Sequence, residues 1–267
     1  MLRRASSLLP VAGMLLAAGA CDQLTSTSSG GNPVMLVTLN ARTRAGAYTT
    51  NPVGNFYRVG SATFSSAGSA TDSCRVLAYD PNAVPTPITA TPIGGGGFVA
   101  IKMSGRTDTL RKVSTTDFTY RLSTTAGILF TPGDTITFVI PGDVAGFPGV
   151  TVQGRTAEPF TFNPIVVPSA GPMTLTWTAA TDANAAMLVS LRYNNGTGTG
   201  LNAQLFCDFK DGGTGTVPAA LTALWAGSSM RDVLAQRLRT ALIRVSGATD
   251  SYFNMISIFD LPTPVSP

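Results

Sequence analysis

The side chains that could perform chemistry are few in this sequence, and two residue types on which many enzymes depend are almost missing. The 267 residues contain no histidine, and Glu158 is the only glutamate. Histidine is the commonest general base and a frequent metal ligand, so its absence excludes Ser-His-Asp and Cys-His catalysis and most zinc sites. A catalytic site would have to use aspartate, lysine, tyrosine or serine. We find no catalytic motif among these, and the sequence predicts no catalytic residue, metal or cofactor.

The stretch GGGGFVAIK, residues 94 to 102, resembles the glycine-rich loop and the Val-Ala-Ile-Lys strand of protein kinases. In kinases a hairpin separates the two, so that the lysine can reach the phosphates. The glycines here leave no room for that hairpin, and the chain lacks both the H-R-D and the D-F-G motifs. We therefore interpret the stretch as a turn entering a strand, in which Val99, Ile101 and Met103 share one face. Lys102 is expected on the other face.

Three cysteines raise a second kind of chemistry. Cys21 follows the N-terminal apolar segment, whereas Cys74 and Cys207 lie within segments that we predict to be strands. Export to an oxidising compartment permits a disulfide between the latter two, which would join the two halves of the chain. Two buried free thiols are the alternative.

Binding side chains are sought in the loops, because loops carry much of protein function. The segment YNNGTGTGLN, residues 193 to 202, is long, polar and flanked by predicted strands. Aromatic rings at or near loops can stack on sugars, although core packing is the more common role of such aromatic residues. The candidate binding residues are Tyr193, Asn194, Asn195, Trp225 and Tyr252.

The N-terminal segment MLRRASSLLPVAGMLLAAGAC has the order of a secretory signal: basic residues, an apolar run, and small residues before Cys21. The run is too short to cross a membrane comfortably as a helix. Its end, LLAAGAC, resembles the lipobox of bacterial lipoproteins. The resemblance implies that residues 1–20 are removed after Ala20 and that Cys21 receives lipid. Cleavage by an ordinary signal peptidase at Ala18-Gly19-Ala20 is the alternative.

A lipidated Cys21 would hold the protein on a membrane, because two or three acyl chains anchor durably. Residues 21–33, rich in Ser, Thr and Gly, are then expected to form a flexible linker. The expected location is the bacterial cell envelope, on the inner or outer membrane, facing the periplasm or the cell surface. Basic residues form no stripe interleaved with aromatics, so nucleic acid is not an expected partner.

The remaining chain is predicted to be all-β. Only 12% of residues are charged, and short apolar runs alternate with turns rich in Gly, Pro, Ser and Thr. In TITFVI, Ile136, Phe138 and Ile140 alternate as on a half-buried strand. The proline-rich segment NPIVVPSAGP, residues 163–172, separates two series of such runs. We therefore expect two tandem immunoglobulin-like β-sandwich domains, 34–165 and 166–263.

The second series opens with MTLTWTAATD, which resembles the early strand and loop of fibronectin type III and other immunoglobulin-like domains. The resemblance implies a sandwich with Trp177 in its core. A short helix is expected near 218–226, between Pro218 and Gly227. Residues 231–245 fit either a helix or a strand. The β context favours a strand with Leu234, Leu238 and Leu242 on one face and Arg237 and Arg239 on the other.

These features predict a membrane-anchored envelope lipoprotein without catalytic activity, acting in structure or in protein interaction. Its partners would be the membrane, through Cys21, and envelope proteins. Glycan binding through loop aromatics is the alternative. An aspartate-dependent hydrolase is a third, less favoured hypothesis, since any two carboxyl groups could flank a sugar but no pair is singled out by the sequence.

Overall fold

A computed structural model of the chain describes residues 24–25, 31–44, 47–59, 70–83, 88–114, 118–181, 183–245 and 251–261. The lipidation site predicted at Cys21 lies outside these residues. The described chain consists of strands joined by turns, with a single helix of eight residues, so the predicted all-β class is confirmed. No helix among these residues is long and apolar enough to span a bilayer.

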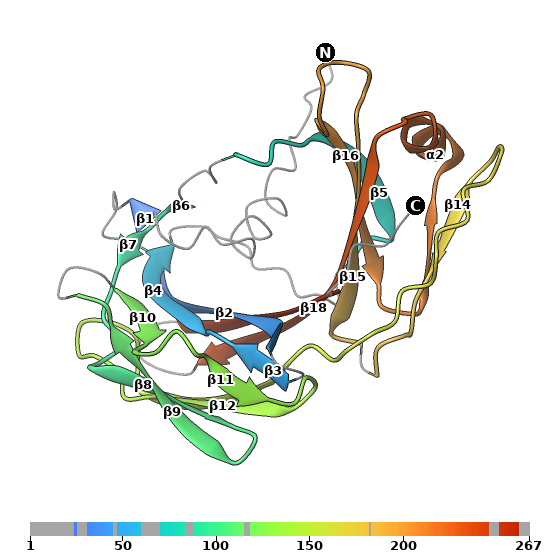
Figure 1. Ribbon diagram of the computed structural model, residues 1–267. Helices are drawn as coiled ribbons and strands as arrows, with labels where there is room; N and C mark the ends of the chain where they lie inside the picture. Colours follow the sequence, from blue (N-terminus) through green and yellow to red (C-terminus); the bar gives the residue numbers. More distant parts are fainter. Residues whose placement is uncertain are drawn as a thin grey trace.

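One long, bent sheet organises the molecule (Figure 1). Neighbouring strands along it are antiparallel except for the central pair β2 and β19, which run parallel. Across the sheet the strands are β13 (Val150–Arg155), β12 (Thr135–Ile140), β8 (Phe98–Met103), β9 (Arg106–Lys112), β10 (Thr119–Leu122), β4 (Val53–Val59), β2 (Asn32–Arg44), β19 (Ser251–Asp260), β18 (Arg231–Val245), β15 (Ala185–Tyr193), β16 (Ala203–Lys210) and β5 (Ser73–Ala78).

Shorter elements lie beside this sheet. Strand β3 pairs with both β2 and β11, β7 pairs with β4, β1 pairs with β6, and β14 pairs with β17. Their bounds are β1 (Leu24–Thr25), β3 (Ala47–Thr50), β6 (Ile88–Thr89), β7 (Thr91–Pro92), β11 (Ile128–Phe130), β14 (Met173–Thr176) and β17 (Thr214–Val217), and the helix is α2 (Ala219–Ala226).

The strand pairing differs from the predicted division into domains 34–165 and 166–263. Strand β5 of the first range pairs with β16 of the second, and β2 pairs with β19 along eight residues. The expected boundary therefore does not separate two sheets. The physical reason is that strands pair through long-range contacts, which local turn composition does not reveal. The prolines of the segment 163–172 lie in the connection between β13 and β14, in which Ile165 and Val167 pack against the main core.

The predicted linker 21–33 also differs in part. Leu24–Thr25 form β1, which pairs in parallel with β6, and β2 already begins at Asn32. Proline is tolerated at the start of a strand, because one missing ladder bond costs little there. The proline at position 33 accordingly belongs to β2.

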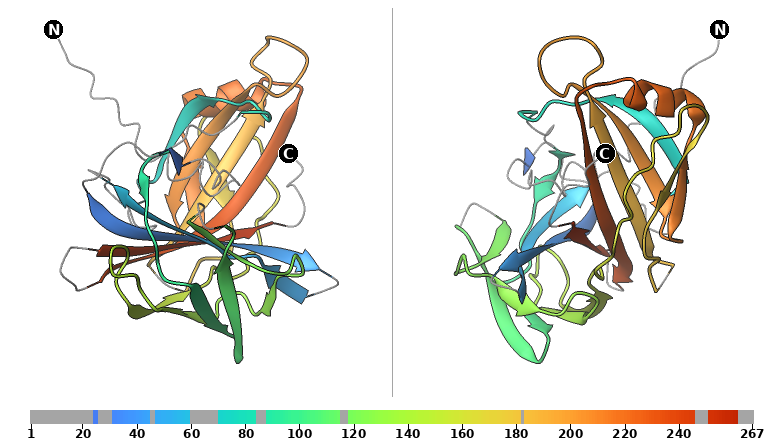
Figure 2. Two further views of the ribbon diagram at one scale, coloured as in Figure 1. Left: turned by 90° about the vertical axis from the view of Figure 1, so that its left-hand side faces the viewer. Right: turned by 45° about the vertical axis from the view of Figure 1, so that its right-hand side comes forward.

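The main hydrophobic core covers one face of the bent sheet. Strands β8, β9, β12 and β13 curl back over β2 and β4, and β13 reaches β18 and β19 (Figure 2). The approach is close, because a Cβ on Gly154 of β13 would overlap the methyl group of Met255 in β19. Farther along the sheet, β14, β17 and α2 lie over β15 and β16 (Figure 1). Trp177 and Trp225 are both buried in the main core.

Residues 231–245 form the long strand β18, as the β context indicated. The alternation also agrees with the prediction, since Arg237 and Arg239 share the core face with Val233 and Ala235. A strand is favoured over a helix here because β15 and β19 lie on its two sides and satisfy its backbone groups. Helix α2 forms where it was predicted, between Pro218 and Gly227.

Glycines 94 to 96 form a close-packed approach to β8. A Cβ on Gly95 would overlap the buried ring of Phe56. The hydroxyl of Tyr120 accepts a hydrogen bond from the Gly95 backbone N–H (3.2 Å) and donates one to the Gly96 carbonyl (2.5 Å). Burial is the main reason that the pKa of Tyr120 is raised. The glycines thus serve packing, and Lys102 on β8 is exposed as expected.

Candidate functional site

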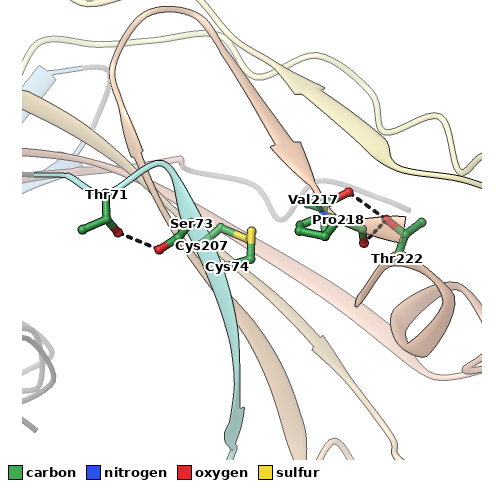
Figure 3. The surroundings of a disulfide bond; sticks show 7 residues. All are labelled: Thr71, Ser73, Cys74, Cys207, Val217, Pro218 and Thr222. Atoms are coloured by element: carbon green, nitrogen blue, oxygen red, sulfur yellow. Dashed lines mark hydrogen bonds between the residues drawn. A yellow bond between two sulfur atoms is a disulfide. The ribbon is translucent and has the colours of Figure 1, made fainter. Parts of the chain in front are cut away.

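The β16–β5 end of the sheet is joined covalently. Cys74 of β5 lies directly opposite Cys207 of β16, and the two form a disulfide with a Cα–Cα distance of 4.0 Å. The bond lies on the core face, where Cys207 is fully buried. Figure 3 shows it between the strands, with Thr222 of α2 beyond it donating hydrogen bonds to the carbonyls of Val217 and Pro218. An edge strand from early in the chain is thereby fixed to the later half.

The opposite face of this end carries two arginine–aromatic stacks. The Arg75 guanidinium lies over the ring of Phe206 (5.0 Å to the centroid), and the Arg192 guanidinium lies over the ring of Tyr79 (4.7 Å). All four side chains are half-buried. Both Nε atoms are buried and lack a hydrogen-bond partner. Stacking of this kind holds guanidinium groups in fixed orientations.

The polar residues around these stacks bond to one another. Ser190 Oγ donates to Gln204 Oε1 (2.5 Å), and Arg192 Nη1 lies 3.3 Å from the carboxylate of Asp232. Cross-strand side-chain pairs of this kind stabilise neighbouring strands. The register places Gln204 opposite Arg192 and Phe206 opposite both Ser190 and Arg75. The result is a mixed polar and aromatic face across β15, β16 and β5.

The carboxylates at this end have unequal surroundings. Burial raises the pKa of Asp208, and Asp72 adds to the rise, whereas Arg75 opposes it. Asp72 itself accepts a hydrogen bond from the Lys210 backbone N–H (2.7 Å) and lies 3.7 Å from its ammonium group. The Asp72 carboxylate is thus engaged by Lys210.

Two of the predicted binding residues are part of the core. Tyr193 and Trp225 are 4% and 0% exposed. The Trp225 Nε1–H donates to the Arg192 carbonyl (3.1 Å), so α2 is fastened to β15. The Arg231 guanidinium lies over the Trp225 ring. Their aromatic rings therefore pack against protein, as the core alternative allowed.

The two predicted asparagines shape the loop after β15. Asn194 Nδ2 donates to the carbonyls of Gly198 (3.2 Å) and Gly200 (2.7 Å), and Asn195 Oδ1 accepts from Thr197 N–H (3.1 Å). Asx hydrogen bonds of this type build turns without any ligand. The loop itself is exposed and projects beyond the end of β15 and β16 (Figure 1).

Tyr252 lies elsewhere, on β19 opposite Val34 of β2, where it is half-buried against a smaller apolar cluster. The structure therefore does not bring the five candidate residues together. Within the described ranges, no three His, Cys, Asp or Glu side chains are grouped so as to hold a metal ion.

Residues that sequence reasoning did not single out are Arg75, Tyr79, Arg192 and Phe206. A signal was present in SCRVLAYD, where alternation sets Arg75 and Tyr79 on the face opposite Cys74. The sequence around β5 does not indicate that β16 is its neighbour, so the stacking partners of Arg75 and Tyr79 could not be predicted.

Comparison with known proteins gives little further direction. No protein-family model matches the chain, and no curated protein matches it. One solved structure to which it was matched is a segment of two fibronectin type III domains from chicken tenascin. It has 13% sequence identity, covers 84% of this chain and 97% of that chain, and has a TM-score of 0.18. At this TM-score the match supports no argument about fold details or function.

Proposed function

We propose that this chain is an exported bacterial lipoprotein, attached to an envelope membrane through Cys21, with a non-catalytic role in structure or protein interaction. The order of residues before Cys21 supports export and lipidation. The disulfide between Cys74 and Cys207 supports an oxidising compartment, since such bonds persist in the periplasm and on cell surfaces.

The observation that carries the interaction role is the face around Arg75 and Arg192. Its aromatic and charged side chains are half-buried and mutually paired, and no reactive pair stands out from them. Arginine and aromatic residues are enriched where proteins bind one another. A fixed, mixed polar and aromatic surface of this kind suits recognition better than proton transfer.

Anchoring is tested by expressing the full chain and its Cys21→Ser variant with a radiolabelled fatty acid. We expect label and membrane association in the unmodified chain only, and an intact mass equal to the chain from Cys21 plus acyl groups. An unacylated chain beginning at Cys21 would refute the anchor while leaving export in place. Separation of inner and outer membranes then assigns the membrane.

The interaction role is tested by photo-crosslinking in native cells. A benzophenone amino acid is placed at Phe206, and a matched control is placed at Val144, a fully exposed position on a distant turn. We expect a discrete crosslinked partner from Phe206 and none from Val144. Identical crosslinking patterns at both positions would count against this face as an interface.

Glycan binding is the second candidate, favoured by the combination of Tyr79, Gln204 and Arg192 on one face. Amide, guanidinium and phenol groups together offer both donors and acceptors to sugar hydroxyls. A glycan array probed with the wild type and with Arg192→Ala tests it. Selective binding that the substitution abolishes supports it, and a flat response rejects it.

A further inference from the structure

Strand β5 is the last strand of the sheet, and among the described residues only β16 pairs with it, although β17 and α2 also lie near it. β16 occupies the inner edge from Ser73 to Ala78. The outer edge lies at the border of the molecule, beside α2 (Figure 2). An unpaired edge presents a row of backbone donors and acceptors that can pair with another strand.

The disulfide identifies which residues point outward. In an antiparallel pair, facing residues alternate between those that exchange hydrogen bonds and those that do not, and the latter have the shorter Cα–Cα distance. Cys74 and Cys207 are 4.0 Å apart at Cα, which marks them as a pair that does not exchange bonds. Five residue pairs further along the two strands, and therefore in the alternate phase, the Tyr79 N–H donates to the Asn202 carbonyl (3.0 Å), as this assignment requires.

It follows that Cys74, Val76 and Ala78 direct their N–H and C=O groups away from β16. In the described chain none of these six groups has a hydrogen-bond partner. The middle residue, Val76, is 48% exposed, although it is a large apolar side chain within a strand. Backbone groups and an apolar contact surface are therefore presented together.

Short edge strands are usually protected by lysine, proline or a bulge. None interrupts SCRVLA, and the nearest proline follows Asp80, after the strand has ended. At that end the exposed Asp80 uses Oδ1 to accept the Asn82 N–H (2.8 Å), which leaves Oδ2 available. At the other end, Lys210 pairs with Asp72. The edge thus has one apolar centre and one acidic end.

We infer that the outer edge of β5 binds an extended polypeptide segment of a partner protein as an added strand, with an apolar residue beside Val76 and a basic residue beside Asp80. This is recognition by strand addition, in which the backbone supplies affinity and alternate side chains supply selectivity. The inference rests on the proposed interaction role; it adds the outer edge of β5 to the face around Arg75 and Arg192 and names the chemistry of the partner.

The disulfide gives this edge its rigidity. Because β5 pairs only with β16 in the described sheet, an added strand would pull on a strand held from one side. The bond between Cys74 and Cys207 holds β5 in register while its outer groups are engaged. A rigid edge loses less conformational entropy on binding than a mobile one.

The test uses a display library of random linear peptides selected on the oxidised mature chain. Selected peptides are then synthesised and measured against Val76→Pro, which removes the outward N–H of residue 76. Proline is tolerated where the N–H faces solvent, so the fold should survive. We expect peptides with an apolar centre and a basic end, and a loss of affinity of about tenfold or more in the proline variant.

Two more variants and a set of modified peptides distinguish backbone pairing at this edge from other modes of binding. Val76→Lys retains the N–H but protects the edge with charge, and should also weaken binding; Val144→Pro, on a distant exposed turn, should not. Each selected peptide is also methylated at its odd-numbered or at its even-numbered backbone nitrogens. Only the set whose N–H groups face β5 should abolish binding. Failure to select any peptide, or selected peptides that bind Val76→Pro and wild type equally, would overturn the inference. Because the purified chain is used, either result is independent of whether Cys21 is lipidated.

Discussion

Arg237 and Asp211 form an ion pair in which neither side chain is reached by water. Arg237 Nε lies 2.6 Å from Asp211 Oδ2, and the two side chains are 1% and 0% exposed. The Trp177 Nε1–H also donates to Asp211 (2.6 Å), and Arg237 donates to the carbonyls of Pro159 (2.8 Å) and Thr178. The guanidinium of Arg237, on β18, thus joins the turn at Asp211 after β16 to the segment around Pro159 after β13.

Removing either partner of this pair should be severely destabilising. Arg237→Met leaves the Asp211 carboxylate buried without its counter-charge and frees two carbonyls. We expect a loss of about 3–5 kcal/mol in the free energy of unfolding, measured by urea denaturation. The matched control is Asp232→Asn, which breaks the half-exposed pair with Arg192 and should cost about 1 kcal/mol or less. Equal losses would contradict the role assigned to burial.

Reduction of the disulfide should destabilise the chain strongly. Cys74 and Cys207 are 133 residues apart, so the closed loop is long, and the chain-entropy model gives about 5 kcal/mol. We expect the melting temperature of the Cys74→Ser, Cys207→Ser double variant to fall well below that of the oxidised protein. Adding reductant to the wild type should lower its melting temperature similarly, while leaving the double variant unchanged. If neither the double substitution nor reductant lowers the melting temperature of the wild type, β16 holds β5 in place without the disulfide.

The glycine stretch before β8 gives a stringent test of packing. Gly95→Ala should cost about 1–3 kcal/mol, because the new Cβ overlaps the ring of Phe56 and forces it to move. Gly97→Ala is the control, since a Cβ there meets no atom within 4 Å, and its effect should stay within about 0.5 kcal/mol. Equal melting temperatures for the two variants would contradict the close packing of Gly95 against Phe56.

Asp208 should make the free energy of unfolding fall as pH rises through its raised pKa. Because its pKa is raised in the folded chain, the folded state binds the proton more tightly than the unfolded state. The associated stability is complete below the pKa of an unfolded aspartate and is lost as pH rises through the raised value. Relative to the wild type, Asp208→Asn should therefore gain stability with rising pH, as followed by urea denaturation at a series of pH values.

Glu158 should change the pH dependence of stability in the opposite direction to Asp208. Burial opposes its ionisation, but hydrogen bonds from Thr181 and the charges of Arg237 and Arg155 outweigh burial and lower its pKa. Stability from Glu158 is present above the unfolded pKa and is lost as pH falls through the folded value. Glu158→Gln should lose stability relative to the wild type as pH rises. A matching trend in both variants would argue against these assignments.

Local pattern predicted much of the secondary structure. The alternation of Ile136, Phe138 and Ile140 identified β12, and Pro218 with Gly227 delimited α2. The burial of Trp177 also agrees with the sequence. In each case the information lies in residues close together in the chain, because periodicity and caps act over one or two turns.

Strand partners were not accessible in the same way. Nothing in VMLVTLNA specifies that its parallel neighbour begins after residue 250, and nothing in SCRVLAYD specifies β16. The aromatic candidates illustrate the same limit, since Trp225 and Tyr252 both lie beside polar stretches of sequence, yet Trp225 is fully buried and Tyr252 is half-buried. Pairing depends on which faces can be buried together, and that is decided by the whole sheet.

The parallel pairing of β2 with β19 has a consequence for how this protein reaches its final form. These are the first long strand and the last strand of the described chain, and they lie side by side at the centre of the sheet. A chain made from its N-terminus onward would therefore leave β2 without its parallel neighbour until β19 has been made. Contacts of such sequence separation form slowly and leave strand edges exposed meanwhile. Aggregation through these unpaired edges is most favoured before β19 is in place, and a holding chaperone would matter most in that interval.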